Sequence, residues 1–208
     1  MNKYTLPLFE DYFYHIYNQG NNGETLFYKP ENYEYFLRKF ENYLSDFIEL
    51  YSYCLMSNHF HFLIRIKNWK EIEPNLKNHT GLEKFIQKSG HKTEVVVSEQ
   101  FRRFFMAYSK AINKQERRTG SLFRKYHKRK LIDIEKYFQS TVVYIHQNPI
   151  HHKLFNDFRN YPWSSYNKII DEKPSLLMKN EVLAYFENIE NFKYVHEHWN
   201  SNYDEIEE

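Results

Sequence analysis

Two histidines, His59 and His61, flank Phe60 at the start of a β-prone run that ends at Ile66. Because side chains alternate along a strand, both imidazoles are predicted to point to one face, about 7 Å apart, with the apolar residues of the run on the other. Imidazole is the commonest protein ligand for metals, and two such groups can share one cation. Two packed or exposed histidines would give the same pattern, so the pair alone leaves a metal site and a structural role open.

A tyrosine and an asparagine, Tyr144 and Asn148, are four residues apart near the end of a predicted helix. Residues at this spacing share a helix face. A phenol over a metal ion, with an amide oxygen completing the ligand set, suits phosphoryl transfer. The same spacing recurs after Tyr14, Tyr17 and Tyr28. Spacing alone therefore leaves Tyr144 as one candidate among 19 tyrosines.

The elements that must hold these side chains follow from periodicity. Alternating or β-rich runs predict strands at 12–19, 47–56 and 59–66, and a basic extended ribbon at 122–132. Helical spacing and cap residues predict helices at 31–44, 98–117, 133–148 and 179–199, the third ending before Pro149. Residues 67–97 are predicted to be irregular, with a short helix near 82–87.

This order of elements predicts an α+β fold, a ferredoxin-like antiparallel sheet with helices packed on it, followed by a C-terminal helical tail. We expect residues 1–170 to form one catalytic domain and residues 171–208 to form an acidic, helical extension. A second His-x-His pair, His196 and His198, lies in that extension. Its imidazoles would diverge on a helix, so we assign the second pair no metal.

Charge is distributed unevenly along the chain, although the net charge is only +2. Residues 101–130 hold eleven basic side chains and one acidic one, a net charge of +10, whereas residues 181–208 carry −7. A basic segment with interleaved aromatics is typical of nucleic-acid binding, and a solvated helix face is the alternative. The candidate phosphate contacts are Arg102, Arg103, Arg124, Lys125, Lys128, Arg129 and Lys130.

Composition excludes several classes of protein. With 19% aromatic residues and few glycines, the chain is neither collagen-like nor disordered. Cys54 is the only cysteine, which excludes an internal disulfide and a cysteine-based zinc site. No apolar run reaches the length of a membrane span, and the first residues do not resemble a signal peptide. We therefore expect a cytoplasmic protein, which would be nucleoid-associated if the basic segment binds DNA.

Four sequence blocks, in order, resemble the REP-associated tyrosine transposases, which are single-tyrosine HUH transposases of the insertion-sequence type. The blocks are Met56–Ile64, Gly120–Arg124, Tyr144–Ile150 and Tyr161–Tyr166. The first resembles the His-hydrophobic-His strand of that group, and the third resembles its catalytic-tyrosine helix. The resemblance covers roughly residues 8 to 170.

The resemblance implies roles for individual residues. His59 and His61 match the metal ligands, Tyr144 matches the nucleophile, and Asn148 matches a third ligand position where insertion-sequence relatives carry Gln. The implied cofactor is a divalent metal, Mg²⁺ or Mn²⁺. The implied activity is cleavage and rejoining of single-stranded DNA near hairpins through a 5′-phosphotyrosine, by a monomer or a homodimer.

Three alternatives to this function stay open at the level of sequence. A domesticated relative could bind hairpin DNA without cutting it. A nucleotide hydrolase with a multi-histidine strand would need a third alternating histidine, and Leu63 lies where we would expect it. A purely structural domain would leave the basic segment unexplained.

Overall fold

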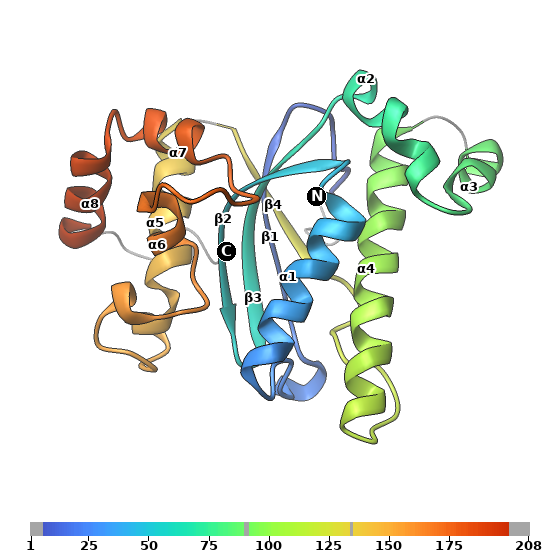
Figure 1. Cartoon of the computed structure of the whole chain (residues 1–208), viewed down its shortest axis with the longest axis horizontal. Coiled ribbons are helices and arrows are strands. Elements are labelled where there is room, and N and C mark those ends of the chain that lie inside the picture. The colour runs from blue at the N-terminus through green and yellow to red at the C-terminus, as the bar shows by residue number, and fades with distance from the viewer. Residues whose placement is uncertain (1–5, 90–91, 134, 200–208) are drawn as a thin grey trace.

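The computed structural model describes residues 6–89, 92–133 and 135–199, arranged in three layers (Figure 1). A four-stranded antiparallel sheet forms the middle layer, and helices cover both of its faces. This arrangement confirms the predicted α+β, ferredoxin-like fold. Within the described ranges, no helix is both long enough and apolar enough to cross a membrane.

The sheet has the strand order β2-β3-β1-β4. Its strands are β1 (Phe13–Gln19), β2 (Ile48–Met56), β3 (His59–Ile66) and β4 (Lys128–Ile132). β2 and β3 form the predicted hairpin, while β1 lies between β3 and β4. Tyr17 of β1 is therefore opposite His61 on one side and Lys128 on the other. This register brings basic residues of β4 beside the histidine strand.

One face of the sheet is an apolar, aromatic core. Phe60 and Phe62 of β3 are fully buried on this face. They pack against α1 (Pro30–Leu44) and α4 (Thr93–Gln115), where the Phe36 ring lies 5.2 Å from Phe60 and 4.7 Å from Phe104 between ring centroids. The helices α1 and α4 carry their apolar side chains at helical spacing, which aligns one stripe of each with the sheet.

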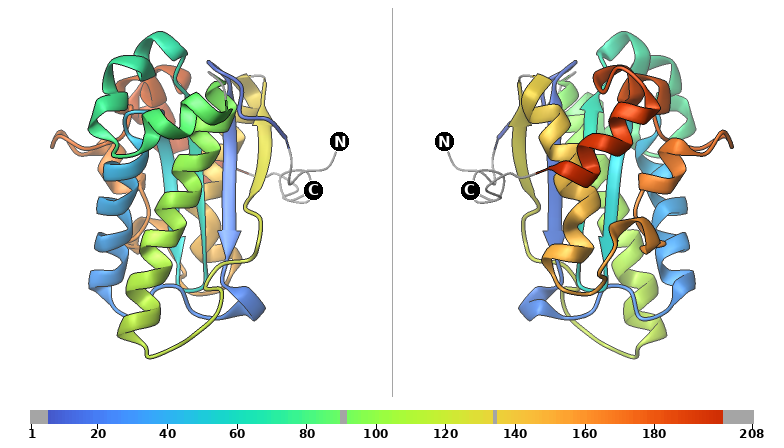
Figure 2. Two further views of the ribbon diagram at one scale, coloured as in Figure 1. Left: turned by 90° about the vertical axis from the view of Figure 1, so that its right-hand side faces the viewer. Right: turned by 90° about the vertical axis from the view of Figure 1, so that its left-hand side faces the viewer.

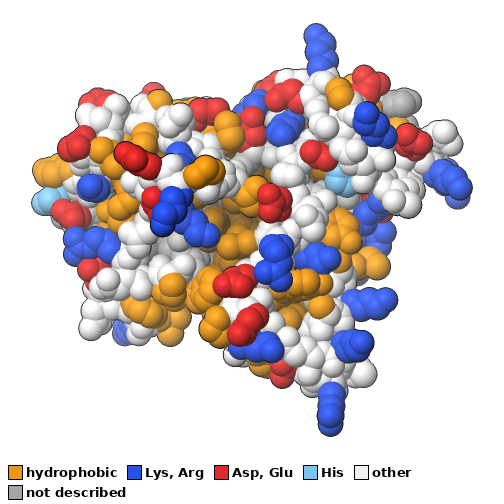
Figure 3. Space-filling view, viewed as in Figure 1, with side chains coloured by type: hydrophobic (Ala, Val, Ile, Leu, Met, Phe, Trp, Pro, Cys, Tyr) orange, Lys and Arg blue, Asp and Glu red, His pale blue; other side chains and the backbone are white. Residues whose placement is uncertain are grey.

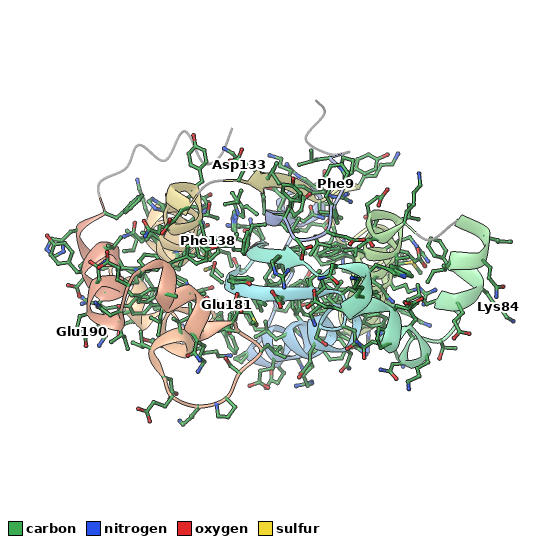
Figure 4. The ribbon with its side chains drawn as sticks, turned by 90° about the horizontal axis from the view of Figure 1, so that it is seen from above. Phe9, Lys84, Asp133, Phe138, Glu181 and Glu190 are labelled. Atoms are coloured by element: carbon green, nitrogen blue, oxygen red, sulfur yellow. The ribbon has the colours of Figure 1, made fainter. Side chains whose placement is uncertain are left out.

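The opposite face is covered by α5 (Glu135–His151) and by the helices that follow it (Figure 2). Seen from above, α5 and the later helices lie on one side of the sheet, and α4 lies on the other (Figure 4). Phe138 of α5 packs edge-on against Phe13 and Tyr51 at centroid distances of 5.2 Å and 5.6 Å. This contact fixes the first half of α5 on the sheet.

The segment between β3 and α4 is more helical than the sequence predicts. It contains α2 (Trp69–Ile72), the 3₁₀ helix η2 (Glu73–Asn78) and α3 (Leu82–Ser89). The prediction that α4 begins at Ser98 is wrong, because the helix begins at Thr93. The run of β-branched valines before Ser98 has low helix propensity, but Val96 and Val97 are fully buried, and this packing outweighs propensity.

The basic ribbon and the following helix also differ from the prediction. Only Lys128–Ile132 forms a strand, and the preceding residues run as a loop anchored by buried Leu122 and Phe123. The helix α5 continues past Asn148 to His151, with Pro149 inside it. Pro149 is tolerated because it lies in the last turn, and the amide of His152 still donates to the carbonyl of Asn148 at 3.0 Å.

The predicted C-terminal helix is two helices, α7 (Lys179–Tyr185) and α8 (Ile189–His198), preceded by α6 (Tyr166–Ile170). The break falls at Glu187, which has a φ of 66°, and Asn188, whose side chain accepts from the amide of Asn191 and so caps α8. Both helices contact α5, so the described part of the extension packs directly on the helix that carries Tyr144.

Candidate active site

A pocket of about 370 Å³ lies at one end of the two central strands, where β1 ends and β3 begins. It is lined by Tyr17, Asn18, Gln19, His59, His61, Arg124, Lys125, Tyr126, Lys128 and His152. The predicted histidine pair and part of the predicted basic segment therefore meet in one cavity. Strand alternation places the histidines here because the neighbouring residues Phe60 and Phe62 occupy the core side.

The contacts of His59 identify which nitrogen can bind a cation. Its Nδ1 lies 2.7 Å from Oδ1 of Asn58, and it donates to this acceptor in the tautomer that carries the hydrogen on Nδ1. In a neutral imidazole Nε2 then has a lone pair, and it lies 3.3 Å from Oδ1 of Asn148. The Asn148 amide is oriented by its Nδ2, which donates to the carbonyl of Tyr144 at 3.5 Å. In that tautomer two lone pairs face each other, and a cation between them would stabilise the arrangement.

A third imidazole, that of His15 on β1, orients His61. Nδ1 of His61 lies 2.9 Å from Nε2 of His15, and both rings are buried. Burial lowers the pKa of both imidazoles, that of His15 to about 3, so both are neutral. When Nδ1 of His61 donates to His15, Nε2 of His61 keeps its lone pair as a metal ligand.

The residues present fit a divalent cation held by two imidazoles and one amide. In the part of the chain that the structure describes, no three His, Cys, Asp or Glu side chains are placed to hold a cation by themselves. The amide oxygen of Asn148, 3.3 Å from Nε2 of His59, is the predicted third donor. Imidazole nitrogens favour Mn²⁺ over Mg²⁺, which prefers oxygen ligands. His59, His61 and Asn148 stay predicted ligands.

Tyr144 lies beside the histidines but is buried. Its ring meets those of His61 and His15 edge-on, at centroid distances of 5.6 Å and 5.8 Å, and stacks on that of His151 at 6.1 Å. Only 2% of Tyr144 is exposed, and the residue does not line the pocket. The phenol can therefore reach a bound strand only after a side-chain rotation or a shift of α5.

Two tyrosines line the pocket: Tyr126 belongs to the predicted basic segment with interleaved aromatics, and Tyr17 was missed by sequence reasoning. The Tyr17 ring stacks on His61 at 5.4 Å between centroids, and Nζ of Lys128 lies 5.2 Å from its centre. Tyr126 is 53% exposed beside Lys125. Alternation along β1 would have put His15 and Tyr17 on one face, but only the pairing of β1 with β3 reveals that this is the histidine face.

His152 was also missed. Its ring lies 4.6 Å from that of His59 between centroids, and it lines the pocket. It follows α5 directly, and the predicted end of this helix at Asn148 hid its proximity. A strand bound in the pocket would meet His152 beside the proposed ligands.

The seven predicted phosphate contacts divide into two groups. Arg124, Lys125 and Lys128 line the pocket. Lys130 lies two residues further along β4, opposite His15, and so belongs to the same face of the sheet.

The other three lie away from the pocket, on the side of α4. Arg102 and Arg103 both pair with the buried carboxylate of Glu99, at 2.6 Å and 2.8 Å. Arg129 is mostly buried, and it donates to the carbonyl of Leu6 and to His127. The structure thus brings together four of the predicted basic residues at the site and separates three.

The second His-x-His pair has a different role. His198 is exposed, whereas His196 is buried against α5, with its Nε2 2.8 Å from Nδ1 of His146. The Nε2 of His146 lies 2.7 Å from Oγ of Ser165. This buried network ties α8 and the Ser165 turn to the middle of α5 and supports the position of Tyr144 and Asn148.

Comparisons with known proteins give one likeness of fold. No protein-family model matches the sequence, and no curated protein matches it. Among solved structures, the fold is similar to that of a REP-associated tyrosine transposase bound to a REP hairpin, with a TM-score of 0.58 and 13% identity. The match covers 84% of this chain and 89% of that one. At this identity the likeness shows a common fold.

Proposed function

We propose that this chain is a metal-dependent single-stranded DNA endonuclease and strand transferase that acts beside hairpins through a 5′-phosphotyrosine. The observation that carries the proposal is the facing pair of His59 Nε2 and Asn148 Oδ1, 3.3 Å apart, with Tyr144 one helical turn before Asn148. A fold similar to that of a transposase bound to a REP hairpin supports hairpin DNA as the partner.

Substrate binding would begin with the basic rim of the pocket. Arg124, Lys125 and Lys128 supply positive charge around a cavity whose walls include aromatic rings. Phosphates of a single strand would be held by these cations, and unpaired bases could stack on the exposed ring of Tyr126. Stacking of this kind requires bases without a pairing partner, so the strand would enter unpaired.

Cleavage would use Tyr144 as the nucleophile. A divalent cation held by His59, His61 and Asn148 would polarise the scissile phosphate. The Tyr144 oxygen attacks phosphorus, so a bond from that oxygen to phosphorus forms while the bond from phosphorus to the 3′ oxygen breaks. The phenol gives up its proton, and the 3′ oxygen takes one up to leave as a hydroxyl.

Rejoining would follow from the same linkage. The phosphotyrosine conserves the phosphodiester bond energy, so a second 3′-hydroxyl can attack it and release Tyr144. His59 and Asn148 approach each other within one chain, with Tyr144 one helical turn away, which supports a site that a monomer can assemble. The burial of Tyr144 implies that a conformational step precedes attack.

A covalent-adduct assay tests the proposal. Wild-type protein, Mn²⁺ and a labelled hairpin with single-stranded flanks should give a protein–DNA adduct that survives denaturing electrophoresis. Tyr144→Phe should abolish the adduct, by about a thousandfold or more. Tyr17→Phe and Tyr126→Phe are the matched controls, because these two phenols line the pocket. Loss of the adduct in Tyr17→Phe, with retention in Tyr144→Phe, would reassign the nucleophile.

A hairpin-binding protein without cleavage activity is the second candidate. The burial of Tyr144 favours it, since a nucleophile that never reaches the pocket would be silent. Tight hairpin binding by wild type, with no adduct for any hairpin or metal, would support this alternative.

A further inference from the structure

A second groove, of about 760 Å³, lies between α4 and the segment 120–129. This groove lies on the α4 side of the sheet, whereas the histidine pocket lies on the α5 side. The two cavities have four residues in common, Asn18, Arg124, Lys125 and Tyr126. Figure 2 shows the segment crossing the end of the sheet between β1 and α4. A single short loop is therefore the wall between the two cavities.

This dividing loop is firmly anchored. The amide of Asn21 donates to the carbonyl of Leu122, and the amide of Arg124 donates to the carbonyl of Gln19, at 2.9 Å and 3.0 Å. Leu122 and Phe123 are buried in the core below it. Arg124, Lys125 and Tyr126 are exposed on top. The loop forms a ridge with two basic residues and one aromatic ring at its crest.

The α4 groove combines cations with exposed apolar surface. Arg102 and Lys110 lie along one wall, and Lys and Arg side chains project over α4 in Figure 3. Met106, between them in the sequence, is 56% exposed, and Tyr126 on the ridge is 53% exposed. Cations next to exposed apolar side chains suit a single strand, whose phosphates and unpaired bases are both accessible, better than a duplex, whose bases are stacked inside.

We infer that the α4 groove binds the unpaired DNA strand that flanks the segment held at the histidine pocket, and that the strand bends over the Arg124–Tyr126 ridge. The inference rests on the proposed function, because it assigns the path of that same substrate. It gives Arg102 and Lys110 a role that the pocket cannot, since both lie outside its lining. Lys110 makes no ion pair among the described residues.

The test compares binding of labelled hairpins with short and long single-stranded flanks, by fluorescence anisotropy in the full chain. Wild type should bind the long-flank hairpin more tightly. Lys110→Glu should remove this gain, by about fivefold or more, and lower the salt dependence of long-flank binding by about 0.7 in the log–log slope. Binding of the short-flank hairpin should stay within about twofold. Lys114→Glu, an equal change of charge on the same helix outside the groove, should keep the gain.

Three results would overturn the inference: no gain from the long flank, equal weakening of both hairpins by Lys110→Glu, or the same loss in Lys114→Glu. The adduct assay separates this failure from that of the proposed function. If the adduct forms but binding does not depend on flank length, only the inference about the α4 groove is wrong. If the long flank tightens binding and this gain needs Lys110, but no adduct forms, only the proposed cleavage chemistry is wrong.

Discussion

The two faces of the sheet differ in what they bury. Facing α1 and α4, Phe60 and Phe62 sit in an aromatic core without polar groups between them. Facing α5, the same strand carries His59 and His61, and His61 contacts the imidazole of His15 and the ring of Tyr144. One strand thus supplies both layers, since its side chains alternate.

The difference shows how a small protein can keep a polar cluster rigid. The apolar face holds β3 in place through burial, so the histidines do not need to contribute stability themselves. The α5 face carries the energetically unfavourable burial of imidazoles, because His15, His61, His146 and His196 are all buried there. On the α4 side, among the residues that the structure describes, His127 is half-buried between Phe101 and Phe105. Acid should therefore act mainly on the α5 face.

Acidification should have the largest effect on stability, and it should act differently on the two faces of the sheet. Burial lowers the pKa of His15 and His127 to about 3 and that of His196 to about 4, and the pKa values of His61 and His146 are lowered as well. An unfolded histidine titrates near 6.5, so below that pH the unfolded chain binds protons that the folded chain does not. Each buried histidine should then reduce the free energy of unfolding by about 1.4 kcal/mol per pH unit, until its folded pKa is reached.

Denaturant unfolding followed by circular dichroism from about pH 7 to about pH 5 measures this slope. His127→Phe should remove the contribution of one histidine to the pH dependence of the unfolding free energy. The larger contribution, from the histidines of the α5 face, should remain. A free energy of unfolding that stays constant over this range would show that the histidines are not buried as a group.

Phe62→Ala probes the apolar face. The Phe62 ring lies 4.8 Å from that of Phe40 and 4.9 Å from that of Phe60, and the side chain is fully buried. Its removal leaves a cavity and should cost about 3–5 kcal/mol of unfolding free energy. The yield of adduct per folded molecule should stay within about twofold, because the ring is on the other side of the sheet from the pocket. A selective loss of adduct would mean that the faces are coupled.

The sequence was sufficient for whatever depends on local periodicity. The hairpin of β2 and β3 and the helix carrying Tyr144 have clear patterns, and their residues do converge in space. The sequence could not reveal the role of His15, Tyr17 or His152, because these residues reach the site only through tertiary contacts. Tyr17 and His152 line the pocket, and His15 contacts His61 behind it. The pairing of β1 with β3 brings in His15 and Tyr17, and the continuation of α5 through Pro149 brings in His152. The charge pattern predicted the basic segment, but it could not show which of its residues line the pocket and which lie on the α4 side.

His59→Ala probes the polar face with a smaller effect. The adduct should fall by at least about a hundredfold, equivalent to about 2.7 kcal/mol, since a proposed metal ligand is lost. His59 is only partly buried, so the free energy of unfolding should change by less than about 1 kcal/mol. His198→Ala, in the other His-x-His pair, is the control and should change neither quantity. An unchanged adduct in His59→Ala would refute the ligand assignment.

Lys128→Gln and Arg103→Gln should give the smallest effects and the sharpest test of which cations meet DNA. Lys128 lines the pocket, and its loss should weaken binding of a short-flank hairpin by about three- to tenfold. Arg103 donates to Glu99 and to the carbonyl of Thr80, on the side of α4 away from the pocket. Its guanidinium holds down the pKa of the Glu99 carboxylate together with Arg102, so Arg103→Gln should cost about 1 kcal/mol of stability and leave binding unchanged. Equal loss of binding in both variants would mean that DNA responds to the total charge of the basic segment, and that the pocket does not select among its cations.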